Sequence, residues 1–221
     1  MTARQGGRPA RTLVLEGEPL EGDGHAAGYV ADAIEIARRL DPGRLEAMAH
    51  ALAGLRAGGG RLFFLGVGGS AANASHATND FRKLAGIESY CATDNVSELT
   101  ARTNDDGWHS TFVEFLRGSR LNARDGVFVF SVGGGDEARD VSANLVHALR
   151  YAAAQGAAIF GVVGRDGGYT ARVAQHCVVI PVVNEQAVTP HTESFHALVW
   201  HLLVSHPVLQ HEPMKWESIT P

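Results

Sequence analysis

The residues best suited to chemistry are histidines and carboxylates on two segments with helical periodicity. His76 and Asp80 are four residues apart, which places both on one face of a helix. Glu193 and His201 differ by about 80° around a helix axis, which also permits a shared face. Two imidazoles and two carboxylates are a plausible ligand set for a divalent metal, with zinc the natural candidate. Spacing does not show that the helices meet, and a solvated helix pair or a buried histidine would give the same pattern.

Three glycine-rich segments follow apolar, strand-like runs. The first is Gly66-Val67-Gly68-Gly69-Ser70, and the others are residues 131–136 and 164–168. Glycine lets backbone amides approach an anion at a helix N-terminus, so the first segment can cradle a phosphate. The alternative is a tight turn in which Ser70 caps the helix. Position 71 is alanine where a dinucleotide fingerprint has glycine, and no P-loop lysine follows, so no nucleotide cofactor is expected.

Short apolar strands alternate with helical segments. Two helices are predicted between residues 26 and 57. Strands are predicted at residues 61–66, 89–92, 127–131, 157–163 and 177–182, and further helices at residues 71–84, 108–118, 138–154 and 190–205. This alternation is typical of an α/β protein with a parallel sheet covered on both faces. Ligands bind at the carboxyl edge of such sheets, so the three glycine loops are expected at one edge.

Composition excludes several classes of protein. The chain has 221 residues and a formal net charge of -5, which gives no electrostatic footprint for nucleic acid. No apolar run approaches the ~20 residues of a membrane span, and no secretory signal is apparent, so we expect a cytoplasmic protein without a membrane partner. Cys91 and Cys177 are predicted to be reduced core residues. We predict a flexible arm over residues 1–25, a single domain over 26–206 and a C-terminal tail over 207–221.

Together these motifs resemble the sugar isomerase (SIS) domain family, in its phosphoheptose isomerase branch. The stretch from residue 66 to residue 76 is similar to the family's Gly-Asn-Gly-Gly-Ser segment and following helix. Further similar pieces follow in the family's order: Thr93-Asp94, Asn104-Asp105, Ser131 before a glycine loop, residues 164–168, and a last helix with Glu193 and His201. The resemblance covers residues 26 to 206. It implies a doubly wound, five-stranded parallel sheet in an αβα sandwich, and a homotetramer with N-terminal helices between subunits and interfacial active sites.

The resemblance also implies an aldose–ketose isomerase that interconverts sedoheptulose 7-phosphate and a D-glycero-heptose 7-phosphate through an enediol. Carried over by position, Asp80 is the base, His201 is the acid, and zinc is bound by these two with His76 and Glu193. A carboxylate and a histidine suit the two proton transfers, and zinc would polarise the carbonyl. The residues expected to bind the sugar phosphate are Gly68, Gly69, Ser70, Asp94, Ser131, Gly133, Gly134 and Gly135.

The sequence departs from the family at the site itself. Asp80 replaces a glutamate, and Glu193 replaces a glutamine. Residues 131–136 read Ser-Val-Gly-Gly-Gly-Asp where the family has Ser-Thr-Ser-Gly-Asn-Ser, so three hydroxyls are lost. Asp136 brings a negative charge to the place where a phosphate would be held. Arg102 or Arg165 are candidates to compensate.

Two alternative functions follow from these departures. One is a non-catalytic SIS module that binds a sugar phosphate or a protein partner. The other is an isomerase of an unphosphorylated or modified sugar. Retention of His201 favours an enzyme, whereas the altered loop after the third strand favours a binding module.

Overall fold

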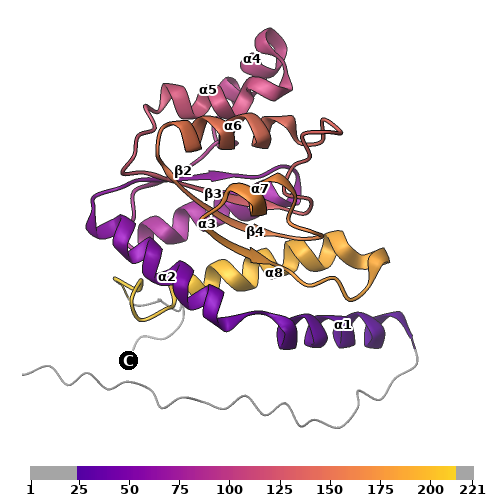
Figure 1. Ribbon diagram of the computed structural model, residues 1–221. Coiled ribbons are helices and arrows are strands. Elements are labelled where there is room, and N and C mark those ends of the chain that lie inside the picture. Colours follow the sequence, from indigo (N-terminus) through magenta and orange to yellow (C-terminus); the bar gives the residue numbers. More distant parts are fainter. Residues whose placement is uncertain (1–23, 213–221) are drawn as a thin grey trace, which may run out of the picture.

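Five short strands form one parallel sheet (Figure 1). The strands are β1 (Leu62–Leu65), β2 (Ser89–Cys91), β3 (Gly126–Ser131), β4 (Ala158–Val163) and β5 (His176–Val179). Their spatial order is β2-β1-β3-β4-β5, and every neighbouring pair is parallel. The structure is a computed structural model that describes residues 24–212. The predicted α/β class and five-stranded parallel sheet are confirmed.

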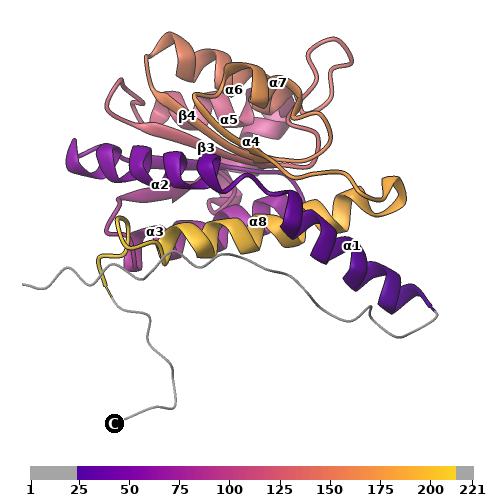
Figure 2. The same cartoon turned by 60° about the horizontal axis from the view of Figure 1, so that its bottom comes forward.

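Helices cover both faces of the sheet. One face carries α2 (Pro42–Ala57), α3 (Gly69–Lys83) and α8 (Val188–Val204) (Figure 1). The other carries α5 (Thr111–Gly118), α6 (Ala143–Ala154) and α7 (Gly168–Val173), with α4 (Val96–Asp106) packed on α5. Single turns of 3-10 helix are η1 (Trp108–Ser110) and η2 (Glu185–Ala187). Helix α1 (His25–Arg39) extends away from this body (Figure 2).

The core lies on both sides of the strands because successive side chains of a strand point to opposite faces. Phe64 and Phe128 stack at 5.2 Å between ring centroids on the face covered by α2, α3 and α8. Trp200 of α8 is 1% exposed in the same cluster. Phe63 and Val127 belong to the cluster on the α5 and α6 face. Strands β1 and β3 are therefore buried on both faces, whereas Tyr90 of the edge strand β2 is exposed.

Helices α4 and α7 and the start of α6 differ from the sequence prediction. No residue of α4 is buried, so it lacks the apolar stripe that periodicity detects. Its local signal is Asn95, whose side chain accepts from the Glu98 amide at 3.2 Å. Helix α7 has only six residues. Helix α6 begins at residue 143, and not at 138, because Asp140 and Ser142 have positive φ and residues 136 and 141 form an antiparallel bridge.

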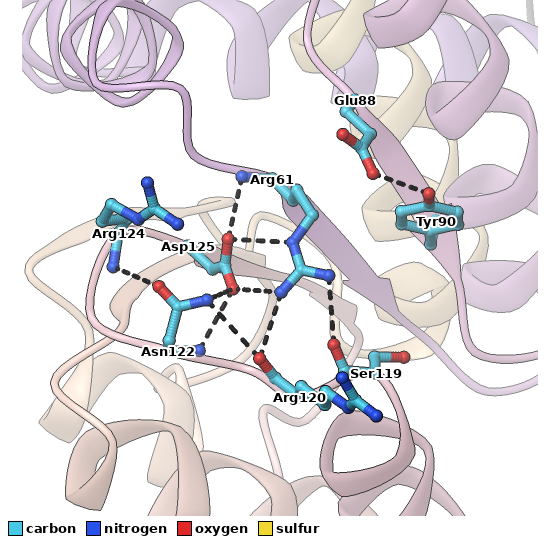
Figure 3. A network of polar contacts seen from close by, with 8 residues as sticks. All are labelled: Arg61, Glu88, Tyr90, Ser119, Arg120, Asn122, Arg124 and Asp125. Atoms are coloured by element: carbon cyan, nitrogen blue, oxygen red, sulfur yellow. Dashed lines mark hydrogen bonds and ion pairs between the residues drawn. The ribbon is translucent and has the colours of Figure 1, made fainter.

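A buried ion pair joins β1 and β3 at the amino edge of the sheet (Figure 3). Asp125 is 2% exposed and accepts hydrogen bonds from the Arg61 backbone amide, the Arg61 guanidinium and Asn122. Burial is the largest single influence and raises the pKa of Asp125, but the hydrogen bonds from Arg61 and Asn122 together outweigh it and lower that pKa. This network fixes the edge of the sheet opposite the glycine loops.

Residues just after position 206, where the domain is predicted to end, pack against it. Leu209 is fully buried, and the Arg56 guanidinium donates to the carbonyls of Val208 and Leu209. Residues 1–23 and 213–221, most of the predicted arm and tail, lie outside the described residues. Within the described part, no helix is both long and apolar enough to cross a bilayer. Cys91 and Cys177 are buried and unpaired, as predicted.

A fully buried histidine makes the fold sensitive to mild acid. His196 of α8 packs on Phe130, and burial lowers its pKa from 6.5 to about 4. The unfolded chain takes up this proton more readily, so folding stability is lost as the pH falls from about 6.5 to about 4. We predict that this effect lowers the free energy of unfolding by about 2 kcal/mol between about pH 7.5 and about pH 5 in urea titrations.

The matched variant is His196→Asn, which should lose most of this pH dependence whatever its stability at neutral pH. Asp125 has a lowered pKa and destabilises the fold only below about pH 4, so it does not contribute in the same window. An equal loss in the parent and in the His196→Asn protein would contradict the prediction.

Candidate active site

A cavity of about 860 Å³ lies at the carboxyl edge of the sheet. Its walls are the loops that follow β1, β3 and β4 and the beginning of α8. The predicted binding residues that line it are Ser70, Ser131, Gly133 and Gly135. Asp94 stands exposed in the turn after β2 and does not line the cavity. The three glycine loops therefore meet at one edge, as the strand pattern predicts.

Gly134 holds the β3 loop against the β4 loop. Its φ is 68°, and its Cα faces the Gly167 carbonyl so closely that a Cβ would overlap with it. Its amide donates to Ser131 Oγ at 2.9 Å, and its carbonyl accepts from the Thr170 amide at 2.9 Å. The Tyr169 amide donates to the Gly135 carbonyl at 2.8 Å. The first turn of α7 thus fixes the loop that was expected to hold phosphate.

The carboxylate of Asp136 is occupied within its own loop. Its Oδ1 accepts from the amides of Ala138 at 2.9 Å and Arg139 at 3.1 Å. Its Oδ2 lies 3.6 Å from Arg139 Nε. Because backbone donors and a guanidinium neutralise it, the carboxylate is less repulsive to an anion than the sequence suggested.

Several residues that line the cavity were not predicted from the sequence. Ser142 lines the cavity at the N-cap of α6, and its side chain does not cap that helix. Arg139 and Arg172 also line the cavity. Of the two arginines considered earlier, Arg165 lines the cavity, whereas Arg102 pairs with Glu98 on α4 at 2.9 Å. The serine directly before an apolar helix was the available signal for Ser142.

His76, Asp80 and His201 come together from α3 and α8. One ligand atom of each lies within 4.8 Å of those of the other two. Asp80 is half-buried, and both histidines are exposed. His201 Nδ1 lies 2.8 Å from the Ala197 carbonyl, which can only accept, so the contact assigns the proton to Nδ1. This tautomer leaves Nε2 with a free lone pair for a metal or a proton.

Glu193 lies apart from these three residues. Its carboxylate contacts Gly69 at the beginning of α3, where the positive end of a helix favours negative charge. The Glu193 carbonyl accepts from Asn73 Nδ2 at 3.1 Å, and Asn73 Oδ1 accepts from Trp200 Nε1 at 3.4 Å. These bonds join α3 to α8. They set the relative height of the helices that carry the histidine pair.

The cluster and the cavity share helix α3. Ser70 of the cavity precedes His76 by six residues, which is about 9 Å along the helix axis. Asn73 lies between them on the same helix, next to Glu193. A polar row therefore leads from the cavity to the cluster.

The chain is similar to curated proteins over most of its length. It is 32% identical to the phosphoheptose isomerase of Rhodospirillum rubrum over 166 residues, which cover 73% of this chain and 82% of the relative. The chain belongs to the phosphoheptose isomerase family. No protein-family model matches it.

This family member is also 35% identical over 178 residues to the lincomycin biosynthesis protein LmbN of Streptomyces lincolnensis. That match covers 78% of the chain but spans only 64% of LmbN. Among solved structures, the phosphoheptose isomerase of Neisseria gonorrhoeae matches with a TM-score of 0.71 and 23% identity, over 81% of this chain and 95% of that one. The enzyme from Francisella tularensis matches with a TM-score of 0.68 and 22% identity, over 80% and 90%. These two likenesses confirm the fold.

Two adjacent glycines of the β3 loop should respond differently to substitution. Gly134→Ala would place an alanine at a positive φ, which is unfavourable for alanine, and would force its methyl group into the Gly167 carbonyl. It should therefore lower the free energy of unfolding by about 2 kcal/mol or more. Gly133 has open space around its Cα, so Gly133→Ala should change stability by no more than about 0.5 kcal/mol. Chemical denaturation of both variants measures this difference. Similar losses would show that the loop contact is not the constraint.

Proposed function

We propose that the protein is an aldose–ketose isomerase of a sugar phosphate, with sedoheptulose 7-phosphate as the first substrate to test. The observation that carries the proposal is the convergence of His76, Asp80 and His201 from two helices. Relatives named phosphoheptose isomerase support the same reaction class. The cavity at the carboxyl edge, which shares helix α3 with this cluster, supplies space for the sugar phosphate.

Asp80 and His201 supply the two proton transfers that an enediol mechanism needs. Asp80 Oδ1 accepts from Asn79 Nδ2 at 2.9 Å, which leaves Oδ2 to take the proton from the carbon beside the carbonyl. The Ala197 carbonyl orients the His201 ring, so Nε2, when it carries a proton and no metal, can give that proton to the carbonyl oxygen and then take up the proton that leaves the neighbouring hydroxyl. Transfer of the same proton between adjacent carbons converts ketose to aldose.

The donor set of the cluster fits zinc. Two imidazoles and one carboxylate are a common ligand set of catalytic zinc sites, which leave a further position open for substrate. The Ala197 contact to His201 is the kind of outer hydrogen bond that orients a metal-binding imidazole. When bound, zinc supplies Lewis acidity at the substrate carbonyl. Glu193 would join this set only by leaving Gly69.

The exposure of both cluster histidines supports an assembly in which another subunit covers them. Proton transfer at carbon is favoured in a site from which water is excluded. We place α1 at this interface because it extends from the body and leaves Val30 47% exposed. A homotetramer is the proposed assembly. A monomer in light scattering at working concentrations would contradict it.

The same chemistry on a modified sugar is the second candidate. It is favoured by the match to LmbN, a protein named for lincomycin biosynthesis, and by the 136–141 loop that carries Arg139 to the cavity wall. A non-catalytic binding module is less well supported, because a module that only binds has no need for a carboxylate between two histidines.

The reaction is tested by hydrogen exchange at the carbon next to the carbonyl. With sedoheptulose 7-phosphate in deuterated water, the parent protein should form aldose and incorporate deuterium at that carbon. Asp80→Asn should lower both rates by about 100-fold or more, since the general base is lost. Asp106→Asn, at the exposed end of α4, is the matched control and should keep parent rates. Absence of product and of exchange in the parent protein would reject this substrate.

The metal is tested without turnover. Purified protein should retain zinc in elemental analysis, and His76→Ala should weaken zinc binding by about tenfold or more in competition with a chromophoric chelator. His109→Ala removes an exposed histidine far from the cluster in the chain and should bind zinc as the parent does. Equal zinc affinity in the two variants would remove the cluster as the metal site.

A further inference from the structure

The cavity contains two arginines whose charges no carboxylate neutralises. Arg139 is paired with Asp136 across the loop that both belong to. Arg165 and Arg172 line the same cavity, and neither forms an ion pair within residues 24–212. Both side chains are exposed to the solvent that fills the cavity. Both arginines are therefore able to pair with an anionic ligand in this cavity.

The acidic residues of the cavity do not cancel these charges. The Asp136 carboxylate accepts hydrogen bonds from two backbone amides and forms an ion pair with Arg139. Asp166 Oδ1 accepts from the Gly168 amide at 3.1 Å and so serves the turn before α7. The remaining carboxylate, Glu185, belongs to the exposed turn η2 near the start of α8. None of these three carboxylates forms an ion pair with Arg165 or Arg172, so both guanidinium groups can still pair with an anion.

Arg172 is placed by the helix that clamps the β3 loop. Its guanidinium lies 5.4 Å from the centre of the Tyr169 ring, and Arg150 lies 5.9 Å from the same ring. Arg150 in turn forms an ion pair with Glu137 of the 136–141 loop. The Tyr169 amide holds the Gly135 carbonyl. Arg172 is therefore tied by a packed aromatic ring to the loop that lost its hydroxyls.

Arg165 has a left-handed backbone conformation that is unusual for a residue other than glycine. Its φ is 50°, in the left-handed region that residues other than glycine rarely adopt. Such strain persists where the surrounding loop enforces it, and it is frequent at binding sites. Here it belongs to a residue at the cavity wall, in the loop that follows β4.

We infer that Arg165 and Arg172 bind the phosphate of the substrate, in place of the hydroxyl-rich loop that this chain lacks. Guanidinium groups suit a phosphate because they donate parallel, charge-assisted hydrogen bonds to its oxygens. The hydroxyls of Ser131 and Ser142 line the same cavity and complete the set of donors. The identity of the sugar rests on the proposed function, whereas phosphate binding itself does not require turnover. The two arginines thereby select phosphorylated over unphosphorylated sugars.

The inference is tested by calorimetric titration with inorganic phosphate and with sedoheptulose 7-phosphate. Arg172→Gln and Arg165→Gln should each weaken binding of both ligands by about tenfold or more, because each removes a charge-assisted contact. Arg172→Lys should recover part of the affinity, since it keeps the charge but loses the fork of donors. Arg150→Gln is the matched control: it removes an arginine from the same tyrosine ring but not from the cavity, and should bind phosphate as the parent does.

Kinetics separate binding from a structural effect. Loss of a phosphate contact should raise KM with little change in kcat, and thermal melting should show an unchanged fold. Unchanged phosphate affinity in the Arg165→Gln, Arg172→Gln double variant would overturn the inference, as would absence of phosphate binding by the parent protein. Arginine-dependent phosphate binding without isomerisation would reject only the proposed reaction. Isomerisation that is insensitive to both substitutions would reject only the arginine site.

Discussion

The close approach of Gly134 to Gly167 is the contact on which the cavity depends. Two backbones meet there without a side chain between them, since a Cβ on Gly134 would overlap with the Gly167 carbonyl. The approach brings the carbonyls of the β3 loop within reach of the first amides of α7. It thereby fixes the height of α7, and with it Tyr169 and Arg172, beside the loop. Glycine at position 134 is thus required by backbone packing, independently of any anion.

A second constraint governs the cluster. Helices α3 and α8 both begin at the carboxyl edge, and their relative height decides whether His76 and His201 meet. Asn73 fixes that height by bonding both to the Glu193 carbonyl and to the indole of Trp200. The Trp200 ring contacts both histidines, with its centroid 4.7 Å from that of His76 and 3.4 Å from that of His201. The residues proposed to transfer protons thus depend for their position on an amide and an indole to which no chemical role is assigned.

Sequence patterns predicted what depends on apolar burial and missed what depends on local backbone geometry. The strands were found because they are short and largely buried, and His76 with Asp80 because they share one helix. The convergence of His201 with them is a tertiary fact that no spacing contains. Helix α4 was missed because it buries nothing. The start of α6 was misplaced because Ser142 adopts a left-handed conformation that helical periodicity does not register.

The altered β3 loop is compatible with an isomerase once its charges are followed in space. Loss of three hydroxyls and gain of Asp136 would weaken phosphate binding if the loop acted alone. In the folded chain, the Asp136 carboxylate accepts hydrogen bonds from two amides of its own loop, and Ser142 contributes a hydroxyl-bearing side chain to the cavity wall. Arg165 and Arg172 line the same cavity, and within residues 24–212 neither forms an ion pair with a carboxylate of its wall. A module that only binds a sugar phosphate would also need these compensating changes, but it would not need the histidine and carboxylate cluster, so the cluster is what favours an isomerase.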